Sequence, residues 1–207
     1  MNKVLKIIGF LLIAGGLLLM VSIYGPVLKE EIRYQTYSPP PISEIIPVSK
    51  EFGLVIPKIG INTKVFANVD DQNPSQYLPL LTKGVAHAKG SGLPGQNTNV
   101  FIFGHSTDTP LNAARYNAVF YLINKLQAGD EILVFYQGEK FVYQVVGKKV
   151  VSPGDVSQVL DNLSGKTIVL QTCTPPGTTF KRLLVIGKET DWLKKCQLTV
   201  KTWQIMI

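Results

Sequence analysis

Two ionisable side chains stand directly after apolar, strand-like runs of the sequence. His105 follows VFIFG, and Cys173 follows TIVLQT. Polar groups at the ends of strands on a rigid sheet are a common place for a site. Nine positions after Cys173, Arg182 opens the next apolar run, RLLVIG, so a short loop can return it beside the cysteine. The spacing predicts one site built from three strand ends.

These three residue types together fit acyl transfer through a covalent intermediate. A cysteine reacts as its thiolate, and an imidazolium or guanidinium beside a thiol lowers the pKa of that thiol from its ordinary value of about 8.5. His105, with an ordinary pKa near about 6.5, can protonate a leaving amine and deprotonate an incoming one. Arg182 stays charged and carries donors that suit a carbonyl oxygen becoming an oxyanion. Because the chain has two His and two Cys, few other Cys–His sites are possible.

The elements that must position these residues are short and rich in Val, Ile, Phe and Tyr. Two short helices are expected at 113–125 and 156–163, and Gln137-Gly138-Glu139 favours a tight hairpin. Seven or more short strands favour a closed or nearly closed β-barrel, because closure removes exposed strand edges. The candidate strands are residues 53–56, 63–66, 99–103, 131–136, 140–148, 167–171 and 182–187.

The N-terminal block, residues 7–28, contains no charged side chain. As a helix it would span about 33 Å, close to the hydrocarbon thickness of a bilayer. Its length favours an uncleaved signal anchor over a cleaved signal peptide. Lys3 and Lys6 precede it, so the positive-inside rule puts the N-terminus in the cytoplasm. We therefore expect a single-pass cell-membrane protein with an extracellular catalytic domain.

The remaining chain divides by composition into three further segments. Residues 29–51 contain Pro39, Pro40 and Pro41 and predict an extended stalk, which either spaces the domain from the membrane or folds over the site. Residues 52–190 form the expected barrel. Residues 191–207 are a C-terminal extension too short to cross a bilayer and include Cys196, which resembles no motif.

Composition excludes several other classes of protein. The 207 residues are 45% hydrophobic and 17% charged, which disfavours a disordered chain, and the apolar N-terminal block accounts for a mean hydropathy of +0.18. The net charge of +7 is scattered, with no basic and aromatic stripe for nucleic acid. No Gly-rich phosphate loop, CxxC pair or carboxylate cluster is present, so we expect no cofactor and no metal.

Three separated motifs resemble the sortase family. LQTC followed by TPPGTTFKRLLV, with GHS upstream and an N-terminal anchor, matches the family's TLxTC signature with Arg in the next strand. Val169 stands where Thr is usual, whereas Leu170, Thr172 and Cys173 match. The segment GVAHAKGSGLPGQNTNVFIFGHS resembles the family's approach to its catalytic His. The short Cys-to-Arg step and the CTPxG turn are closest to class C and D sortases, and the resemblance covers residues 54–187.

This resemblance implies an eight-stranded β-barrel with short helices and a cysteine transpeptidase that needs no cofactor. By similarity, Cys173 attacks an LPxTG-like sorting signal at the C-terminus of a surface protein, His105 protonates the departing amine, and Arg182 supports the substrate and oxyanion. An amine from a cell-wall precursor or a pilin then opens the thioacyl enzyme, as in surface display of the Gram-positive type. Thr172, the backbone N–H of Thr174, and His87 are implied as supporting groups, although a structural role suits His87 at least as well.

Two other functions remain open from the residues alone. A non-catalytic, membrane-tethered β-barrel that binds envelope polymers or a partner would have an unreactive Cys173. A cysteine endopeptidase would share the same site and differ in using water to resolve the intermediate. No acidic-Pro-aromatic triplet occurs between residues 29 and 52, so we expect no inhibitory lid of the class C kind.

Overall fold

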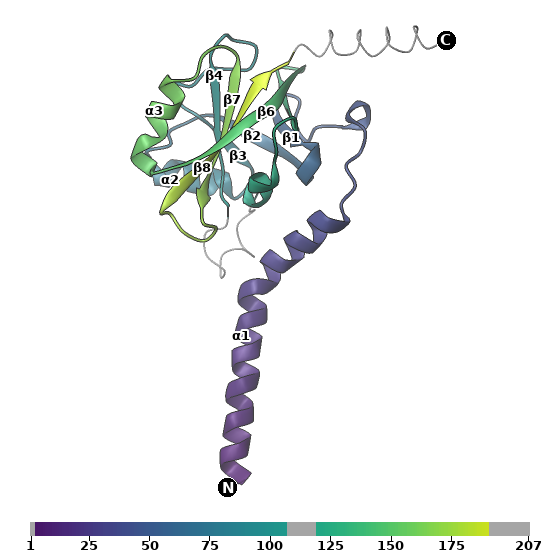
Figure 1. The fold of residues 1–207 in the computed structure, drawn as a ribbon, viewed down its shortest axis with the longest axis vertical. Coiled ribbons are helices and arrows are strands. Elements are labelled where there is room, and N and C mark those ends of the chain that lie inside the picture. The colour runs from purple at the N-terminus through teal and green to yellow at the C-terminus, as the bar shows by residue number, and fades with distance from the viewer. Residues whose placement is uncertain (1–2, 107–118, 191–207) are drawn as a thin grey trace, which may run out of the picture.

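The chain forms a closed antiparallel and parallel β-barrel at the end of a long helix (Figure 1). The computed structural model describes residues 3–106 and 119–190. Within them the strand order is β1-β2-β3-β4-β7-β8-β6-β5, closing on β1, which confirms the predicted mainly β fold with short helices. The strands are β1 (Phe52–Ile56), β2 (Ile61–Val69), β3 (Val85–Ala88), β4 (Asn99–Phe103), β5 (Glu131–Tyr136), β6 (Glu139–Val151), β7 (Thr167–Thr174) and β8 (Lys181–Glu189).

Alternation along the strands creates two apolar layers, one inside the barrel and one outside it. In β7, Ile168 and Leu170 belong to the cluster that fills the barrel, whereas Val169 packs outside it. The outer layer, with Phe101 and Phe103 of β4, is covered by helices α2 (Pro74–Leu81) and α3 (Val156–Asp161). A period of two therefore puts every second residue of β4 and β7 on the face where the helices lie.

The β5–β6 hairpin is as the sequence predicts. Tyr136 pairs with Glu139, so Gln137 and Gly138 form a two-residue turn, with φ of 51° and 84°. Two consecutive left-handed residues match the twist of the flanking strands, and glycine adopts this conformation without strain.

Three elements differ from the sequence expectation. Strand β3 and helix α2 were not predicted: β3 has four residues, and α2 contains Pro79, which argues against a helix interior. Of the helix expected at 113–125, the described part is the 3-10 helix η3 (Tyr121–Lys125), and 113–118 lies outside the described residues. The extension 191–207, with Cys196, also lies outside them.

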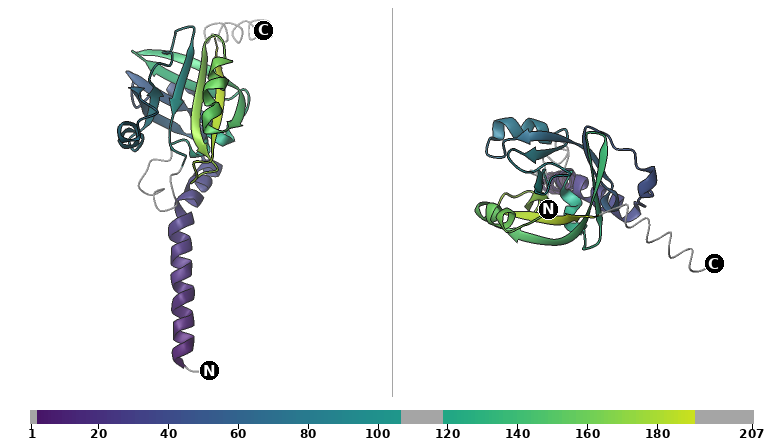
Figure 2. Two further views of the ribbon diagram at one scale, coloured as in Figure 1. Left: turned by 90° about the vertical axis from the view of Figure 1, so that its left-hand side faces the viewer. Right: turned by 90° about the horizontal axis from the view of Figure 1, so that it is seen from above.

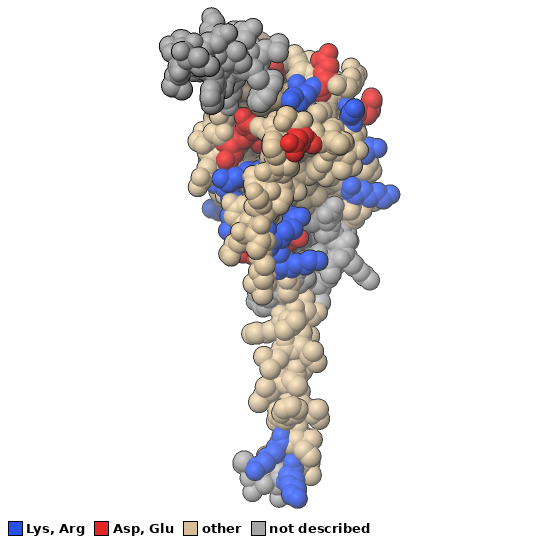
Figure 3. Space-filling view, turned by 90° about the vertical axis from the view of Figure 1, so that its right-hand side faces the viewer, with Lys and Arg blue, Asp and Glu red and all other residues tan. Residues whose placement is uncertain are grey.

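Helix α1 (Lys3–Thr36) has the length and composition of a membrane-spanning helix over Lys3–Ser22, with mean hydropathy 2.6 and no burial against the barrel. In Figure 3 its shaft carries no charged side chain between the basic residues near its start and the charged residues where it meets the barrel. The helix continues eight residues beyond the 1–28 segment. It bends on the way (Figure 1), and its sequence contains Pro26, a residue type that supplies no backbone N–H to the helix ladder and is a common cause of helix bends.

The rest of the expected stalk wraps the barrel. Ile42 and Ile45, around the 3-10 helix η1 (Ile42–Glu44), pack against the outer face of β1, β5 and β6. Asn62 of β2 accepts a hydrogen bond from Val48 N and donates one to Ile46 O, both 2.8 Å long. The segment thus lies against the wall formed by β1 and β5 and has no residue in the cleft described below.

Candidate active site

Cys173 and Arg182 are direct partners across two antiparallel strands. The β7–β8 register pairs Leu170 with Val185 and continues without a shift to Cys173 opposite Arg182. Directly opposed residues of antiparallel strands have Cα atoms about 4.5–5.5 Å apart and side chains on the same face. Cys173 is two residues beyond Gln171 and four beyond Val169, so this face is the outer one. The spacing of nine in the sequence therefore becomes lateral contact between strands.

The main chain around His105 is held by three hydrogen bonds to neighbouring elements. Gly104 N donates to Gln171 O over 3.0 Å, and Thr172 Oγ1 donates to Gly104 O over 2.9 Å. Phe120 N donates to His105 O over 3.0 Å. The parallel β4–β7 register, which ends with Phe103 opposite Gln171, extends through these bonds and brings His105 level with Cys173.

Gly104 is required by close packing. A Cβ at this position would lie 2.9 Å from Phe120 Cδ2 and 3.0 Å from Val85 Cγ1, both tighter than carbon atoms normally approach. The strand can therefore reach His105 only with glycine at 104, and Phe120, fully buried, forms the floor beneath it.

His105, Cys173 and Arg182 line one cleft of about 1230 Å³ on the outer face of the barrel. Helices α2 and α3 flank it: both lie on the left of Figure 1, and the view from above in Figure 2 separates them. The lining combines apolar side chains near the helices with polar groups at the strand ends, a combination common in ligand-binding pockets. Apolar lining residues include Tyr77, Leu81, Phe101, Phe103, Val156 and Leu160.

Arg182 is oriented by the loop that precedes it. Its Nη1 donates to Thr179 O over 3.0 Å and to Lys181 O over 3.3 Å. These bonds hold the guanidinium against the β7–β8 loop, on the residue that the strand register places opposite Cys173. A guanidinium carries five N–H donors, so donors besides this nitrogen are available for a substrate.

Of the two threonines expected to support the site, Thr172 lines the cleft and Thr174 does not. Thr172 is buried, lines the cleft and holds Gly104, so it acts on the His105 segment from beneath. Thr174 ends β7 opposite Lys181 and is not among the described residues that line the cleft.

His87 lies outside the cleft. Its Nδ1 accepts from Asn68 N at 3.3 Å, while Nε2 lies 2.9 Å from Gly92 O and 2.8 Å from Ser91 Oγ. An accepting Nδ1 leaves the proton on Nε2 of the neutral ring. Burial lowers the pKa of His87 below its ordinary value. The structure thus gives His87 a structural part in the β3–β4 connection.

Ser106 is a cleft residue that the sequence reasoning did not single out. Its side chain is buried, and its Oγ has no hydrogen-bond partner among the residues described. The sequence signal that could have identified Ser106 is its position in the GHS motif, directly after His105. As for metals, no three His, Cys, Asp or Glu side chains gather at ligand distance in 3–106 and 119–190.

The comparison with protein families decides what this barrel is. The family model for the sortase domain matches residues 54–190. The chain belongs to the sortase family. Sortases are cysteine transpeptidases, and they are membrane-associated.

Individual sortases resemble the chain at moderate identity. Sortase D of Bacillus subtilis is 28% identical over 138 residues, which cover 65% of this chain and 61% of that relative. Sortase C-1 of Actinomyces oris is 27% identical with a TM-score of 0.56, covering 81% of this chain and 97% of that structure. Sortase C of Clostridium perfringens, solved with the C-terminal cell wall sorting motif, is 26% identical with a TM-score of 0.56, covering 82% and 88%.

Proposed function

We propose that this sortase is a membrane-anchored cysteine transpeptidase that cleaves an LPxTG-like sorting signal and transfers the new acyl end to an amine. The observation that carries the proposal is the pairing of Cys173 with Arg182 on adjacent strands at the edge of a cleft that His105 also lines. Among the relatives, the Clostridium perfringens structure with a sorting motif supports a peptide of this kind as the substrate.

The proposed first half-reaction makes a thioester. The Cys173 thiolate attacks the carbonyl carbon of the Thr–Gly bond, and Arg182 donates to the oxygen as it becomes an oxyanion. The C–S bond forms as the C–N bond breaks, and the imidazolium of His105 gives its proton to the departing amine. The main-chain hydrogen bonds around Gly104 support this role by restricting where the imidazole lies.

The proposed second half-reaction regenerates the enzyme. An amine of a cell-wall precursor or a pilin attacks the thioester carbon, its proton passes to His105, and the C–S bond breaks to restore the thiolate. No electron is gained or lost, and no cofactor is required. Water in place of the amine gives hydrolysis, which is the endopeptidase outcome.

We further propose that residues 7–28 cross the cell membrane once, with the barrel outside. The apolar, unburied shaft of α1 supports a crossing, and Lys3 and Lys6 before it support a cytoplasmic N-terminus. The barrel, residues 52–190, is then the catalytic domain.

The test is to trap the thioester on the full chain in liposomes. Incubation with an LPxTG peptide library should add the mass of the cleaved acyl fragment to Cys173, and added amine should discharge it as a ligated product. Cys173→Ala should abolish the adduct, whereas Cys196→Ala, the matched control for the other cysteine, should keep it. Arg182→Ala should slow acylation about 10²–10³-fold, as expected for losing an oxyanion donor.

Three results contradict the proposal. An unmodified Cys173 across the whole library would favour the binding-module hypothesis. An adduct on Cys196 would show that Cys196, and not Cys173, is the nucleophile. Hydrolysis alone, with every amine tried, would favour the endopeptidase.

A further inference from the structure

The end of α1 is docked on the barrel beside the segment that holds His105. Lys125 of η3 forms an ion pair with Glu31, with Nζ 2.6 Å from Oε1, and its ammonium lies 5.6 Å from the centroid of the Tyr34 ring. Tyr34 packs against the cluster that fills the barrel. The Lys125–Glu31 hydrogen bond raises the pKa of Lys125, which therefore stays charged at neutral pH.

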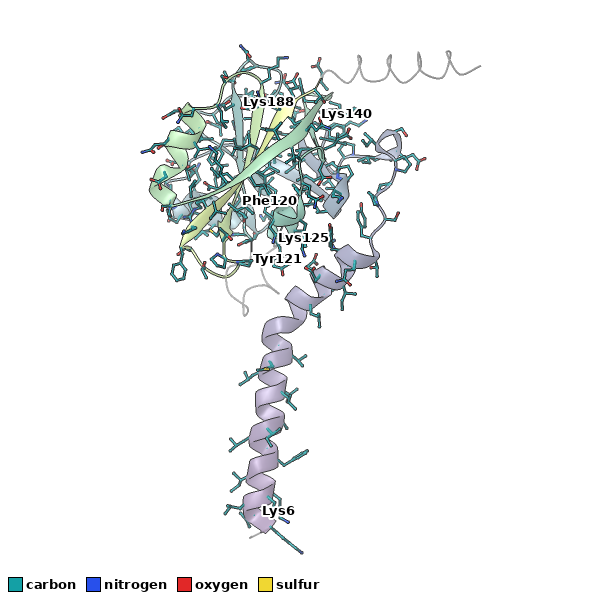
Figure 4. The ribbon with its side chains drawn as sticks, in the orientation of Figure 1. Lys6, Phe120, Tyr121, Lys125, Lys140 and Lys188 are labelled. Atoms are coloured by element: carbon teal, nitrogen blue, oxygen red, sulfur yellow. The ribbon has the colours of Figure 1, made fainter. Side chains whose placement is uncertain are left out.

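A second contact extends this docking beyond the helix. The Tyr37 ring covers Gly60, where a Cβ would lie 3.2 Å from Tyr37 Cζ. Figure 4 shows Tyr121 and Lys125 at the end of the barrel that faces α1, with Lys140 and Lys188 at the opposite end. The last turns of α1 are therefore attached to the barrel by apolar, cation–π and ionic contacts, which set the direction of the barrel relative to the helix.

The docked end of the barrel is also the end where the site lies. β7 ends and β8 begins at the end from which α1 departs, in both Figure 1 and the left view of Figure 2. Cys173 and Arg182 stand at these strand ends. If residues 7–28 cross a bilayer, the β7–β8 loop is on the side of the barrel that faces the lipid.

This loop presents an apolar side chain that the described residues, 3–106 and 119–190, leave exposed. Phe180 is 75% exposed, and Lys181 beside it is exposed as well. Arg182 donates to the carbonyls on either side of Phe180, those of Thr179 and Lys181, which restrains the backbone that carries Phe180. A large aromatic next to a lysine suits the boundary between lipid headgroups and acyl chains, especially with anionic lipid.

We propose that the β7–β8 loop is a second membrane contact of this chain, in which Phe180 inserts into the outer face of the bilayer while the Glu31–Lys125 contact holds the barrel in that orientation. The occupant of this surface is the lipid of the membrane that α1 crosses. Arg182 links the loop to the catalytic centre, so the lipid contact and the oxyanion donor belong to one hydrogen-bonded unit. The inference rests on the proposed membrane span of α1, but not on the transpeptidase reaction.

The experiment places a single tryptophan in the full chain. With Trp192 and Trp203 replaced by Phe, Phe180→Trp is the probe and Lys188→Trp, exposed at the opposite end, is the matched control. Each protein is reconstituted in vesicles of phosphatidylcholine and phosphatidylglycerol, with and without bromine on the acyl chains. Interfacial side chains reach about 5–10 Å into the headgroup–acyl boundary, so bromine should lower the emission at position 180 about twofold and leave position 188 unchanged.

The docking is tested by charge reversal in the same background. Lys125→Glu should reduce the quenching at position 180, and adding Glu31→Lys should restore it. Carbonate extraction, which leaves only integral proteins in the vesicles, checks the span of α1 separately. Thermal melting confirms that each variant is folded.

Two results would overturn the inference for a chain that carbonate does not extract. No quenching at position 180 means that the loop is not in the lipid, and equal quenching at 180 and 188 means that the barrel has no preferred orientation. Quenching that is unaffected by Lys125→Glu removes the docking contact from the proposal. Release of the chain by carbonate would refute the span itself.

Discussion

Gly104→Ala is the substitution for which the structure gives the most definite expectation. The new methyl group would meet Phe120 Cδ2 at 2.9 Å and Val85 Cγ1 at 3.0 Å, inside the buried floor of the site. The backbone cannot simply move away, because Gly104 N is bonded to Gln171 and Gly104 O to Thr172. Either the Phe120 ring shifts or these hydrogen bonds lengthen.

The size of the effect follows from these two routes. An extra methyl in a packed core costs about 1–3 kcal/mol, and each hydrogen bond contributes about 0.5–1.5 kcal/mol, so repacking and backbone movement cost similar amounts. We expect the free energy of unfolding to fall by about 1–3 kcal/mol, which a domain with about 5–15 kcal/mol survives. Acylation should fall further, about 10²-fold, since His105 is the next residue and a displacement of about 1 Å can have that effect.

The assay compares urea unfolding and acylation rates for three proteins. Gly147→Ala is the matched control, because a Cβ there meets nothing within 4 Å and its φ lies outside the left-handed region. Gly104→Ala combined with Phe120→Leu, which shortens the side chain that clashes, should recover part of both losses. The reasoning is refuted if Gly104→Ala is as stable and as fast as Gly147→Ala.

Three other substitutions separate stability from catalysis. Thr172→Val removes the donor to Gly104 O and leaves a buried carbonyl without it, so unfolding free energy should drop by about 1–3 kcal/mol in a urea titration, while Thr172→Ser should stay near wild type. Burial lowers the pKa of His87, so the unfolded chain binds more protons than the folded one below about pH 6.5. The free energy of unfolding should therefore decline from pH 7.5 to 5.5 by at most about 1.4 kcal/mol per pH unit, the melting temperature should fall with it, and His87→Gln should flatten the profile. Arg182→Lys keeps the charge but loses the planar guanidinium, whose Nη1 donates to two loop carbonyls, so the rate of Cys173 acylation should drop about tenfold or more with little change in melting temperature; an unchanged rate would show that charge alone suffices.

The sequence predicted much of the barrel because most strands carry their own local signals. β4 and β5 have the predicted bounds, and β7 was predicted to Gln171 and runs on to Thr174. The exceptions depend on contacts with other parts of the fold. β3 is four residues long and depends on its neighbours for hydrogen bonds, and α2 forms despite Pro79 because its apolar side chains pack on the outer layer. Neither cause can be read from residue types alone.

His87 and Ser106 show the same limit at the site. His87 and His105 both follow apolar residues in the sequence. His105 nevertheless lines the cleft, whereas His87 is buried within β3, since β3 and β4 present different faces at those positions. Ser106 lies three residues beyond the end of β4 and lines the cleft, a placement that no pattern of residue types indicates.

By itself the sequence determined the set of reactive residue types, their order, and the apolar block that precedes the barrel, because these depend on side-chain chemistry and on periodicities within one segment. The spacing also predicted that Arg182 returns beside Cys173. Only the tertiary structure decided the register that sets the two residues directly opposite, the close packing of Gly104 against Phe120 and Val85, and the docking of α1 at the end of the barrel where β7 stops. Each of these depends on strand register or on the packing of segments far apart in the chain, and such contacts are set by the shape of the whole core.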